Sequence, residues 1–157
     1  MQYRGFTRQA RKVMRIAERL AEKEQQLRMG SEYILAGLLQ ENDGVAGQIL
    51  QQLSVNCEEI LTLIHEISLP KTEEQVADGD FLTPESRAIV EEAHAVAERF
   101  DSELVGTEHL LFSIIEHRTS AAARMLLAMN INLGKVYADI LAAMGKENLF
   151  SKEEGKE

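Results

Sequence analysis

Apolar residues recur three and four positions apart along most of this chain, with polar residues between them. In two stretches the apolar positions are Val13, Ile16, Ala17, Leu20 and Ala21, and then Ile89, Val90, Ala93, Val96 and Ala97. This spacing is typical of helices that bury one face. Alanine, leucine and glutamate are frequent and runs of β-branched residues are few, so the pattern predicts an all-α fold.

The pattern occurs twice in the chain. When the sequence is aligned with itself at an offset of 76 residues, Thr7 aligns with Thr83, and the segment 30–35, GSEYIL, aligns with the segment 106–111, GTEHLL. The apolar positions on either side of these segments also match in kind. We interpret this match as an internal duplication, with four helices in each unit and eight in all.

Residues that favour helix starts divide each unit into its helices. Thr7 and Thr83 are suited to cap the first helix, and Pro84 then takes the first helical position, where its missing N–H costs nothing. A glycine breaks the chain before each second helix. The residues predicted to mark the remaining helix starts are Ser31, Gly44 and Asn56 in the first unit, and Thr107, Ser120 and Asn132 in the second.

The duplication sets the predicted domain organisation. One domain spans 1–145, with repeat one at 3–65, a connector at 66–82 and repeat two at 83–145. The charged segment 146–157 has no counterpart in the repeat, so we expect it to be a linker or a frayed end.

Composition and charge narrow the classes of function. The chain has 157 residues, 45% of them hydrophobic and 27% charged, as expected of one globular domain with its own core. Its net charge of −9 disfavours binding to nucleic acid. Residues 1–28 nevertheless hold eight basic and three acidic side chains. This basic first helix is either a surface for a partner or an ordinary solvated face.

The sequence also predicts a location. Cys57 is the only cysteine, which excludes an internal disulfide, and residues 1–13 lack the apolar segment of a secretory signal. No stretch approaches the roughly 18 apolar residues of a membrane span. We therefore expect a cytoplasmic protein that does not bind membranes.

Catalytic and metal-binding signatures are mostly absent from the sequence. No glycine–lysine pair lies in the GxxxxGK[ST] pattern that holds nucleotide phosphates, and HExxH does not occur. Glu91 and His94 have the Glu-x-x-His spacing of di-iron bundles, but Glu18 stands where the first unit would supply the second histidine. We expect no enzymatic activity, cofactor or metal, and a metalloenzyme built on Glu91 and His94 is the disfavoured alternative.

One polar pair occurs in both units: Thr7 with Glu32, and Thr83 with Glu108. A capped helix start offers free N–H groups and a partial positive charge, which suit a small anion. A nearby carboxylate could accept hydrogen bonds from a guanidinium group in forked geometry. The pairs therefore suit a ligand that joins an anion to a guanidinium. A threonine cap followed by an acid also stabilises helices in general, so both interpretations stay open.

The same residues carry a resemblance to a known family. The segments 6–10 (FTRQA), 30–35 (GSEYIL) and 41–46 (ENDGVA), with 82–84 (LTP) and 106–111 (GTEHLL), resemble the Clp N-terminal repeat. This repeat is found doubled at the front of bacterial Clp unfoldases, and the ClpC type is the most similar. The resemblance covers residues 3–145. It departs at Ser31 and Tyr33, where threonine and histidine are usual, and at 116–120, where an acid–glycine run is typical.

The resemblance implies a pseudo-twofold bundle that docks substrate and adaptor proteins for an attached AAA+ ring, which would feed a ClpP-type protease. It also implies recognition of phosphoarginine. The residues that would take the family's ligand roles are Thr7, Glu32, Thr83 and Glu108. The alternative is an adaptor-docking module, free-standing or excised, that binds through the basic first helix at Arg11 and Arg15 and does not recognise phosphoarginine. In either case we expect the isolated domain to be a monomer.

Overall fold

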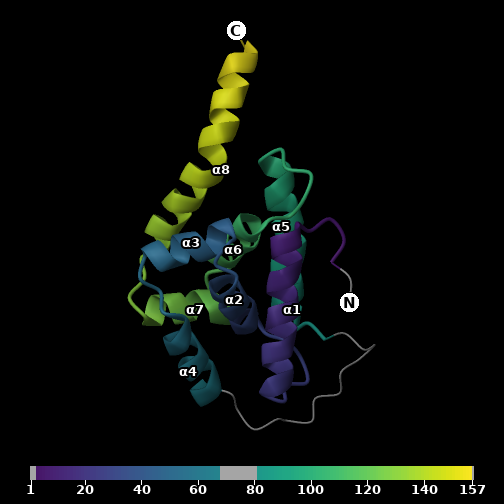
Figure 1. Cartoon of the computed structure of the whole chain (residues 1–157), viewed down its shortest axis with the longest axis vertical. Helices are drawn as coiled ribbons and strands as arrows, with labels where there is room; N and C mark the ends of the chain where they lie inside the picture. Colours follow the sequence, from purple (N-terminus) through teal and green to yellow (C-terminus); the bar gives the residue numbers. More distant parts are fainter. Residues whose placement is uncertain (1–2, 68–80, 157) are drawn as a thin grey trace.

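Eight α-helices form the regular structure of the described residues, as the sequence predicts (Figure 1). The computed structural model describes residues 3–67 and 81–156, with side chains up to residue 144. Repeat one contains α1 (Arg8–Lys23), α2 (Ser31–Gln40), α3 (Val45–Gln52) and α4 (Cys57–Ile67). Repeat two contains α5 (Pro84–Arg99), α6 (Thr107–Glu116), α7 (Ala121–Ala128) and α8 (Leu133–Lys156).

The duplication extends to the turns between helices. Each helix of repeat two begins 76 residues after its counterpart in repeat one. Gln25 and Asp101, at equivalent positions after the first helices, have φ of 59° and 57°, and Ser54 and Asn130 after the third helices have φ of 64° and 63°. The N–H of the residue after each of them reaches back to a carbonyl of the last helical turn at 2.9–3.0 Å. These are the hydrogen bonds of the Schellman motif, which ends a helix in a left-handed residue.

Replacing Ser54 by glycine should stabilise the fold, because a left-handed conformation costs an ordinary residue roughly 1–2 kcal/mol. Glycine adopts this conformation freely and loses part of the gain through its more flexible unfolded state. We expect Ser54→Gly to raise the free energy of unfolding by about 0.5–1 kcal/mol. Asn130→Gly should gain less, because asparagine tolerates the left-handed region. Urea denaturation measures both, and a loss of stability in Ser54→Gly would contradict this account.

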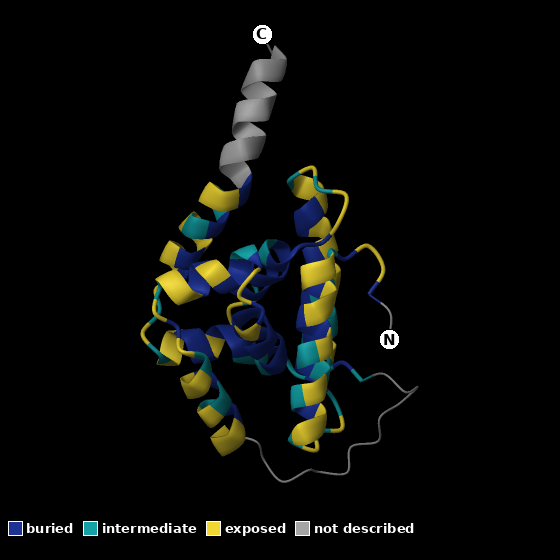
Figure 2. Cartoon of the chain, in the orientation of Figure 1, coloured by how far each residue is buried: buried dark blue, intermediate teal, exposed yellow. Residues whose placement is uncertain are grey.

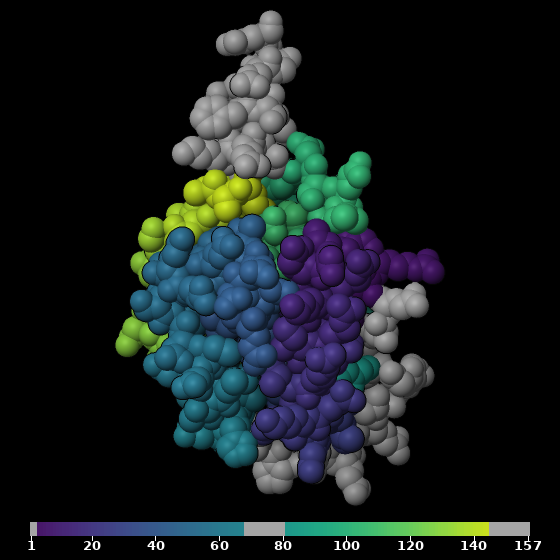
Figure 3. All heavy atoms as spheres, in the orientation of Figure 1, coloured from purple at the N-terminus to yellow at the C-terminus, as the bar shows by residue number. Residues whose placement is uncertain are grey.

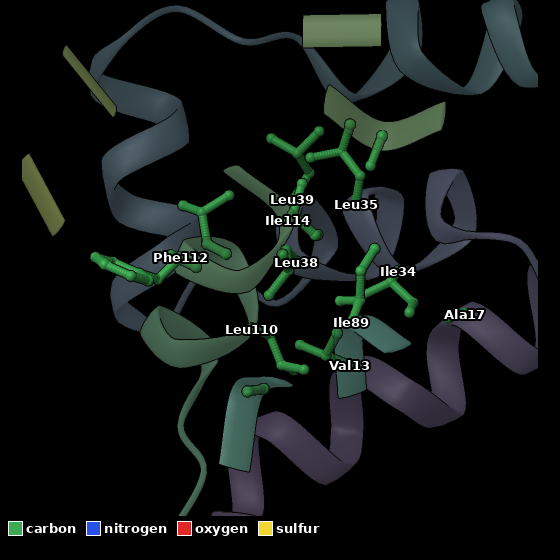
Figure 4. Packing of buried hydrophobic residues seen from close by; sticks show 14 of the residues in the cluster. Val13, Ala17, Ile34, Leu35, Leu38, Leu39, Ile89, Leu110, Phe112 and Ile114 are labelled. Carbon is green, nitrogen blue, oxygen red and sulfur yellow. The ribbon is translucent and has the colours of Figure 1, made fainter. Parts of the chain in front are cut away.

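The second helix of each repeat lies at the centre of the molecule (Figure 2). Seven consecutive residues of α2, 33–39, are buried, as are residues 109–115 of α6. Helices that are apolar on all sides have to be enclosed by others, and α2 contacts α1, α3, α4 and α7. Figure 4 shows side chains from both repeats, among them Val13, Leu38 and Ile114, in one hydrophobic core.

The two repeats interlock through their third helices. Helix α3 packs on α6, and α7 packs on α2. The prediction that Ser31 and Thr107 cap their own helices is wrong, because the preceding glycine holds each N-cap position. Instead, Ser31 Oγ accepts a hydrogen bond from Ala122 N at 3.0 Å, and Thr107 Oγ1 accepts one from Ala46 N at 3.2 Å. Each hydroxyl therefore caps the third helix of the other repeat.

The remaining predicted helix starts are confirmed, and they lie at Thr7, Gly44, Asn56, Thr83, Ser120 and Asn132. Most of the predicted connector, residues 68–80, lies outside the described residues, and its first two residues belong to α4. Helix α8 continues to Lys156, so the backbone of 146–156, expected to be a linker or a frayed end, is helical. In the part of the chain that the structure describes, no helix is long and apolar enough to cross a membrane.

Candidate functional site

Two short backbone contacts join the repeats near the candidate residues. The N–H of Thr7 donates to the carbonyl of Val105 at 2.8 Å, and the N–H of Thr83 donates to the carbonyl of Met29 at 3.2 Å. Each contact belongs to an isolated parallel bridge. The start of each first helix is therefore held beside the residues that lead into the second helix of the other repeat.

Both threonines cap their helices, but their hydroxyl groups differ. Thr7 Oγ1 accepts from Ala10 N at 3.1 Å, and Thr83 Oγ1 accepts from Ser86 N at 3.1 Å. The Thr83 hydroxyl also donates to Ser86 Oγ at 3.0 Å. Ala10 stands at the position equivalent to Ser86, so within residues 3–67 and 81–144 the hydroxyl hydrogen of Thr7 has no acceptor. Of the two threonines, Thr7 is therefore the one whose hydroxyl hydrogen is available to an anion.

Both candidate glutamates fold back over the glycine that precedes their helix. A methyl group added to Gly30 would collide with the carboxylate of Glu32, and one added to Gly106 would collide with that of Glu108. Each carboxylate therefore lies over the N-terminal turn of its own helix, beside the contact between the repeats. Glycine leaves room for it there.

The structure pairs the candidate residues differently from the sequence hypothesis, which placed Thr7 with Glu32 and Thr83 with Glu108. Helix α1 has 16 residues and is about 24 Å long, with Thr7 at its start and Glu32 beyond its end. That pairing is wrong, because the backbone contacts hold Thr7 beside the segment that leads to Glu108, and Thr83 beside the one that leads to Glu32. We call Thr7 with Glu108 the Thr7 site, and Thr83 with Glu32 the Thr83 site.

Glu85 makes the two sites electrostatically unequal. It is the acid in the first turn of α5, and the first turn of α1 has none, with Gln9 at the equivalent position. Glu85 Oε2 accepts hydrogen bonds from Ser31 Oγ at 2.7 Å and from Ala121 N at 3.1 Å. Burial raises the pKa of Glu32, its own backbone N–H opposes this, and the charge of Glu85 raises the pKa further. Sequence reasoning missed Glu85, although this difference between the repeats could have indicated it.

His109 fixes the glycine turn of the Thr7 site. Its Nδ1 accepts a hydrogen bond from the backbone N–H of Gly106 at 2.8 Å, so this nitrogen carries no proton and the ring is neutral. Burial lowers the pKa of His109, and the neighbouring Glu108 opposes this effect. A buried neutral histidine therefore supports the turn over which the Glu108 carboxylate lies.

The fold should lose stability as the pH falls below about 6.5, where an unfolded histidine begins to bind a proton. The folded pKa of His109 is lower, so the unfolded state binds more protons in this range and gains free energy relative to the folded state. His109→Gln keeps an acceptor for the N–H and does not titrate. Urea denaturation at pH 7.5 and 5.5 should therefore show a smaller pH dependence in His109→Gln, and an equal dependence in the two proteins would contradict this role.

The other candidate chemistry is not assembled in the described residues. No three potential metal ligands among them lie together, and the ring of His94 contacts that of Phe6 at 5.4 Å. Burial raises the pKa of the Cys57 thiol, which disfavours the thiolate form that a nucleophile needs. The Thr7 and Thr83 sites remain as the candidate binding sites.

Comparison with known proteins gives related sequences along nearly the whole chain. The chain is 29% identical over 155 residues to the negative regulator of genetic competence ClpC/MecB of Bacillus subtilis, and 28% identical over 156 residues to the chaperone protein ClpB of Oceanobacillus iheyensis. Each alignment covers 99% of this chain and 19% of the relative. The chain therefore spans about one fifth of the length of these curated relatives.

Solved structures with the same fold include Clp N-terminal domains. The N-terminal domain of ClpD from Arabidopsis thaliana has a TM-score of 0.74 at 15% identity, over 90% of this chain and 99% of that one. A complex of the ClpV N-domain with a VipB peptide has a TM-score of 0.66 at 16% identity, over 89% of each chain. The Clp repeat (R) N-terminal domain family matches residues 5–128 and 81–156. The duplicated eight-helix unit thus belongs to the Clp repeat N-terminal domain family.

Proposed function

We propose that this domain docks substrate and adaptor proteins for a Clp-type AAA+ unfoldase that feeds a ClpP-type protease, and that it recognises phosphoarginine on them at two related sites. The observation that carries the proposal is the repeated arrangement of a threonine-capped helix start beside a glutamate of the other repeat. The ClpV N-domain of similar fold, solved with a VipB peptide, supports a docking role.

The chemistry of phosphoarginine matches both parts of each site. The N–H groups of Arg8 and Gln9 at the start of α1, and that of Glu85 at the start of α5, where Pro84 has no N–H, would donate to the phosphate. The helix dipole favours the negative charge of the phosphate at both starts. The glutamate would accept hydrogen bonds from the guanidinium group. Arginine alone would lack the phosphate contacts, and inorganic phosphate would lack the glutamate contacts. Each of them should therefore bind far more weakly than phosphoarginine.

We expect the Thr7 site to bind more tightly than the Thr83 site. The Thr83 hydroxyl already donates to Ser86, and Glu85 adds a negative charge near the place of the phosphate. The raised pKa of Glu32 also favours its neutral form, which cannot pair with a guanidinium as a charge. At the Thr7 site the threonine hydroxyl has no acceptor among the described residues, and the first turn of α1 has no acid.

Calorimetric titration with free phosphoarginine tests the proposal, with arginine and phosphate as control ligands. Binding of about two equivalents with unequal affinities would support it. No binding heat, in a protein whose helical circular dichroism is intact, would contradict phosphoarginine recognition. That outcome would leave the alternative of adaptor docking without this mark.

Replacing Glu85 by glutamine should strengthen the weaker site about threefold to tenfold, because it removes one negative charge near the phosphate. Glutamine is the residue at the equivalent position 9, and its side-chain oxygen can still accept from Ser31 and Ala121. Glu91→Gln removes an exposed charge from the middle of the same helix and is the matched control. The same titration would contradict this explanation if both variants changed the weaker affinity equally.

A further inference from the structure

One face of α1 carries a row of four exposed cations: Arg8, Lys12, Arg15 and Arg19. They are four, three and four residues apart, which places them on the same side of the helix. Together with Glu41 and Asp43 from the loop after α2, they line a cavity of about 510 Å³. Figure 3 shows α1, in purple, bordering the blue residues that follow α2 on this face. We call this cavity the basic groove.

Most of the positive charge in the basic groove is not neutralised within the domain. Lys12 Nζ lies 3.3 Å from Glu41 Oε2, a carboxylate that is 5% exposed and also accepts from Asp43 N. Among the described residues, no carboxylate lies within 4 Å of Arg8, Arg15 or Arg19. Like charges four residues apart on a helix repel each other, so this row opposes the folding of α1.

The second repeat shows that the fold does not need these cations. At the four equivalent positions, α5 has Pro84, Ala88, Glu91 and Ala95. Both helices fold with the same length and pack on the second helix of their own repeat. The row of cations is therefore a property of one surface of this protein and not of the repeat architecture.

We propose that the basic groove binds a short acidic segment of a partner protein in an extended conformation. From Arg8 to Arg19 the helix rises about 17 Å, which matches about five residues of extended chain. Arg15 lies about 10 Å along the axis from Arg8 and about 6 Å from Arg19, so carboxylates two to three residues apart would meet successive guanidinium groups. Arginine favours such partners because its planar group binds a carboxylate through two hydrogen bonds.

The charge of the whole molecule favours a short segment over a long polyanion. Outside residues 1–28 the chain holds 9 basic and 23 acidic residues. Nucleic acid or an anionic membrane would extend beyond the groove and meet this acidic surface, whereas a segment of about five residues would not. The basic groove adjoins the Thr7 site at Arg8, but its cationic side chains are not those of Thr7, Glu108, Thr83 or Glu32. Acidic-segment binding therefore does not depend on phosphoarginine recognition.

Fluorescence anisotropy with a labelled peptide of about ten residues, in which glutamate alternates with serine, tests this proposal. We expect binding that weakens as salt is raised, and no binding of the matched peptide with glutamine in place of glutamate. Arg15→Glu with Arg19→Glu should weaken binding at least tenfold. Free phosphoarginine should not displace the peptide, which separates this surface from the proposed function.

The control is the double variant Arg118→Glu with Arg124→Glu, which changes the net charge equally at exposed positions of repeat two. It should retain binding within about threefold, because its charges lie outside the groove and act only through the screened net charge. Equal losses in the two double variants, with helical circular dichroism intact, would overturn the proposal. It would also be overturned if single-stranded DNA or anionic vesicles, and not the peptide, bound in a manner that required Arg15 and Arg19.

Discussion

Replacing Glu108 by glutamine should weaken phosphoarginine binding at the Thr7 site at least tenfold and leave the Thr83 site unchanged. Glutamine keeps the shape and one acceptor but loses the charge. A hydrogen bond to a charged group contributes about 1.5–3 kcal/mol, and 1.4 kcal/mol corresponds to a factor of ten in affinity. The calorimetric titration should then show one tight equivalent fewer. An unchanged isotherm would contradict the role of Glu108.

Gly106→Ala provides an independent variant of the same site. It leaves the charge of Glu108 in place but puts a methyl group where the carboxylate lies. Because the obstructing atoms are the end of a flexible side chain, the carboxylate can move away at little cost to stability. Phosphoarginine binding should therefore fall while the unfolding transition stays nearly the same.

Double variants distinguish the pairing found in the structure from the pairing within each repeat. If Thr7 acts with Glu108, Thr7→Ala combined with Glu108→Gln damages one site and leaves the other intact. Thr7→Ala combined with Glu32→Gln should damage both sites. The number of equivalents that keep the affinity of the unmodified protein separates the two cases: one, at the Thr83 site, for Thr7→Ala with Glu108→Gln, and none for Thr7→Ala with Glu32→Gln. The opposite result would restore the pairing of Thr7 with Glu32.

Replacing Thr107 by valine should lower the free energy of unfolding by about 1–3 kcal/mol, the cost of leaving a buried donor without its acceptor. The donor is the backbone N–H of Ala46, at the start of α3. Valine matches the shape of threonine, so the change removes the hydrogen bond and keeps the contact with Gly44. Chemical denaturation gives the loss directly.

Thr107→Ser is the matched control for this variant. It keeps the hydroxyl and removes one methyl group, whose burial is worth about 0.8 kcal/mol. Serine is also the residue at the equivalent position 31, where it caps α7. A smaller loss in Thr107→Ser than in Thr107→Val would assign the effect to the hydrogen bond between the repeats. Equal or reversed losses would assign it to packing.

Local signals were sufficient to predict the helices. The residues that start them, such as Thr83 with Pro84, act within a few positions of the chain, and the duplication provides each signal twice. The apolar positions that recur at helical spacing also predicted which faces are buried, as Val13 and Ile89 show.

The contacts between repeats could not be predicted in the same way. Aligning the sequence with itself shows which residues of the two repeats are equivalent. It does not show whether a residue of one repeat lies beside a residue of its own repeat or of the other one. Thr7 and Glu32 share a repeat, yet a helix of 16 residues separates them. The hydroxyls of Ser31 and Thr107 fit the pattern of local caps, and only the packing of α7 on α2 and α3 on α6 gives them their acceptor role.

The exchange of caps between repeats has a consequence for a repeat that stands alone. A single repeat alone would expose the start of its third helix with a backbone N–H that lacks its acceptor, at Ala46 or at Ala122. Two copies related by a twofold axis satisfy both N–H groups at once, because each copy supplies a hydroxyl oxygen that accepts from the N–H of the other copy. A protein of one repeat would make these two hydrogen bonds only as a symmetric dimer, and the duplication makes them within one chain.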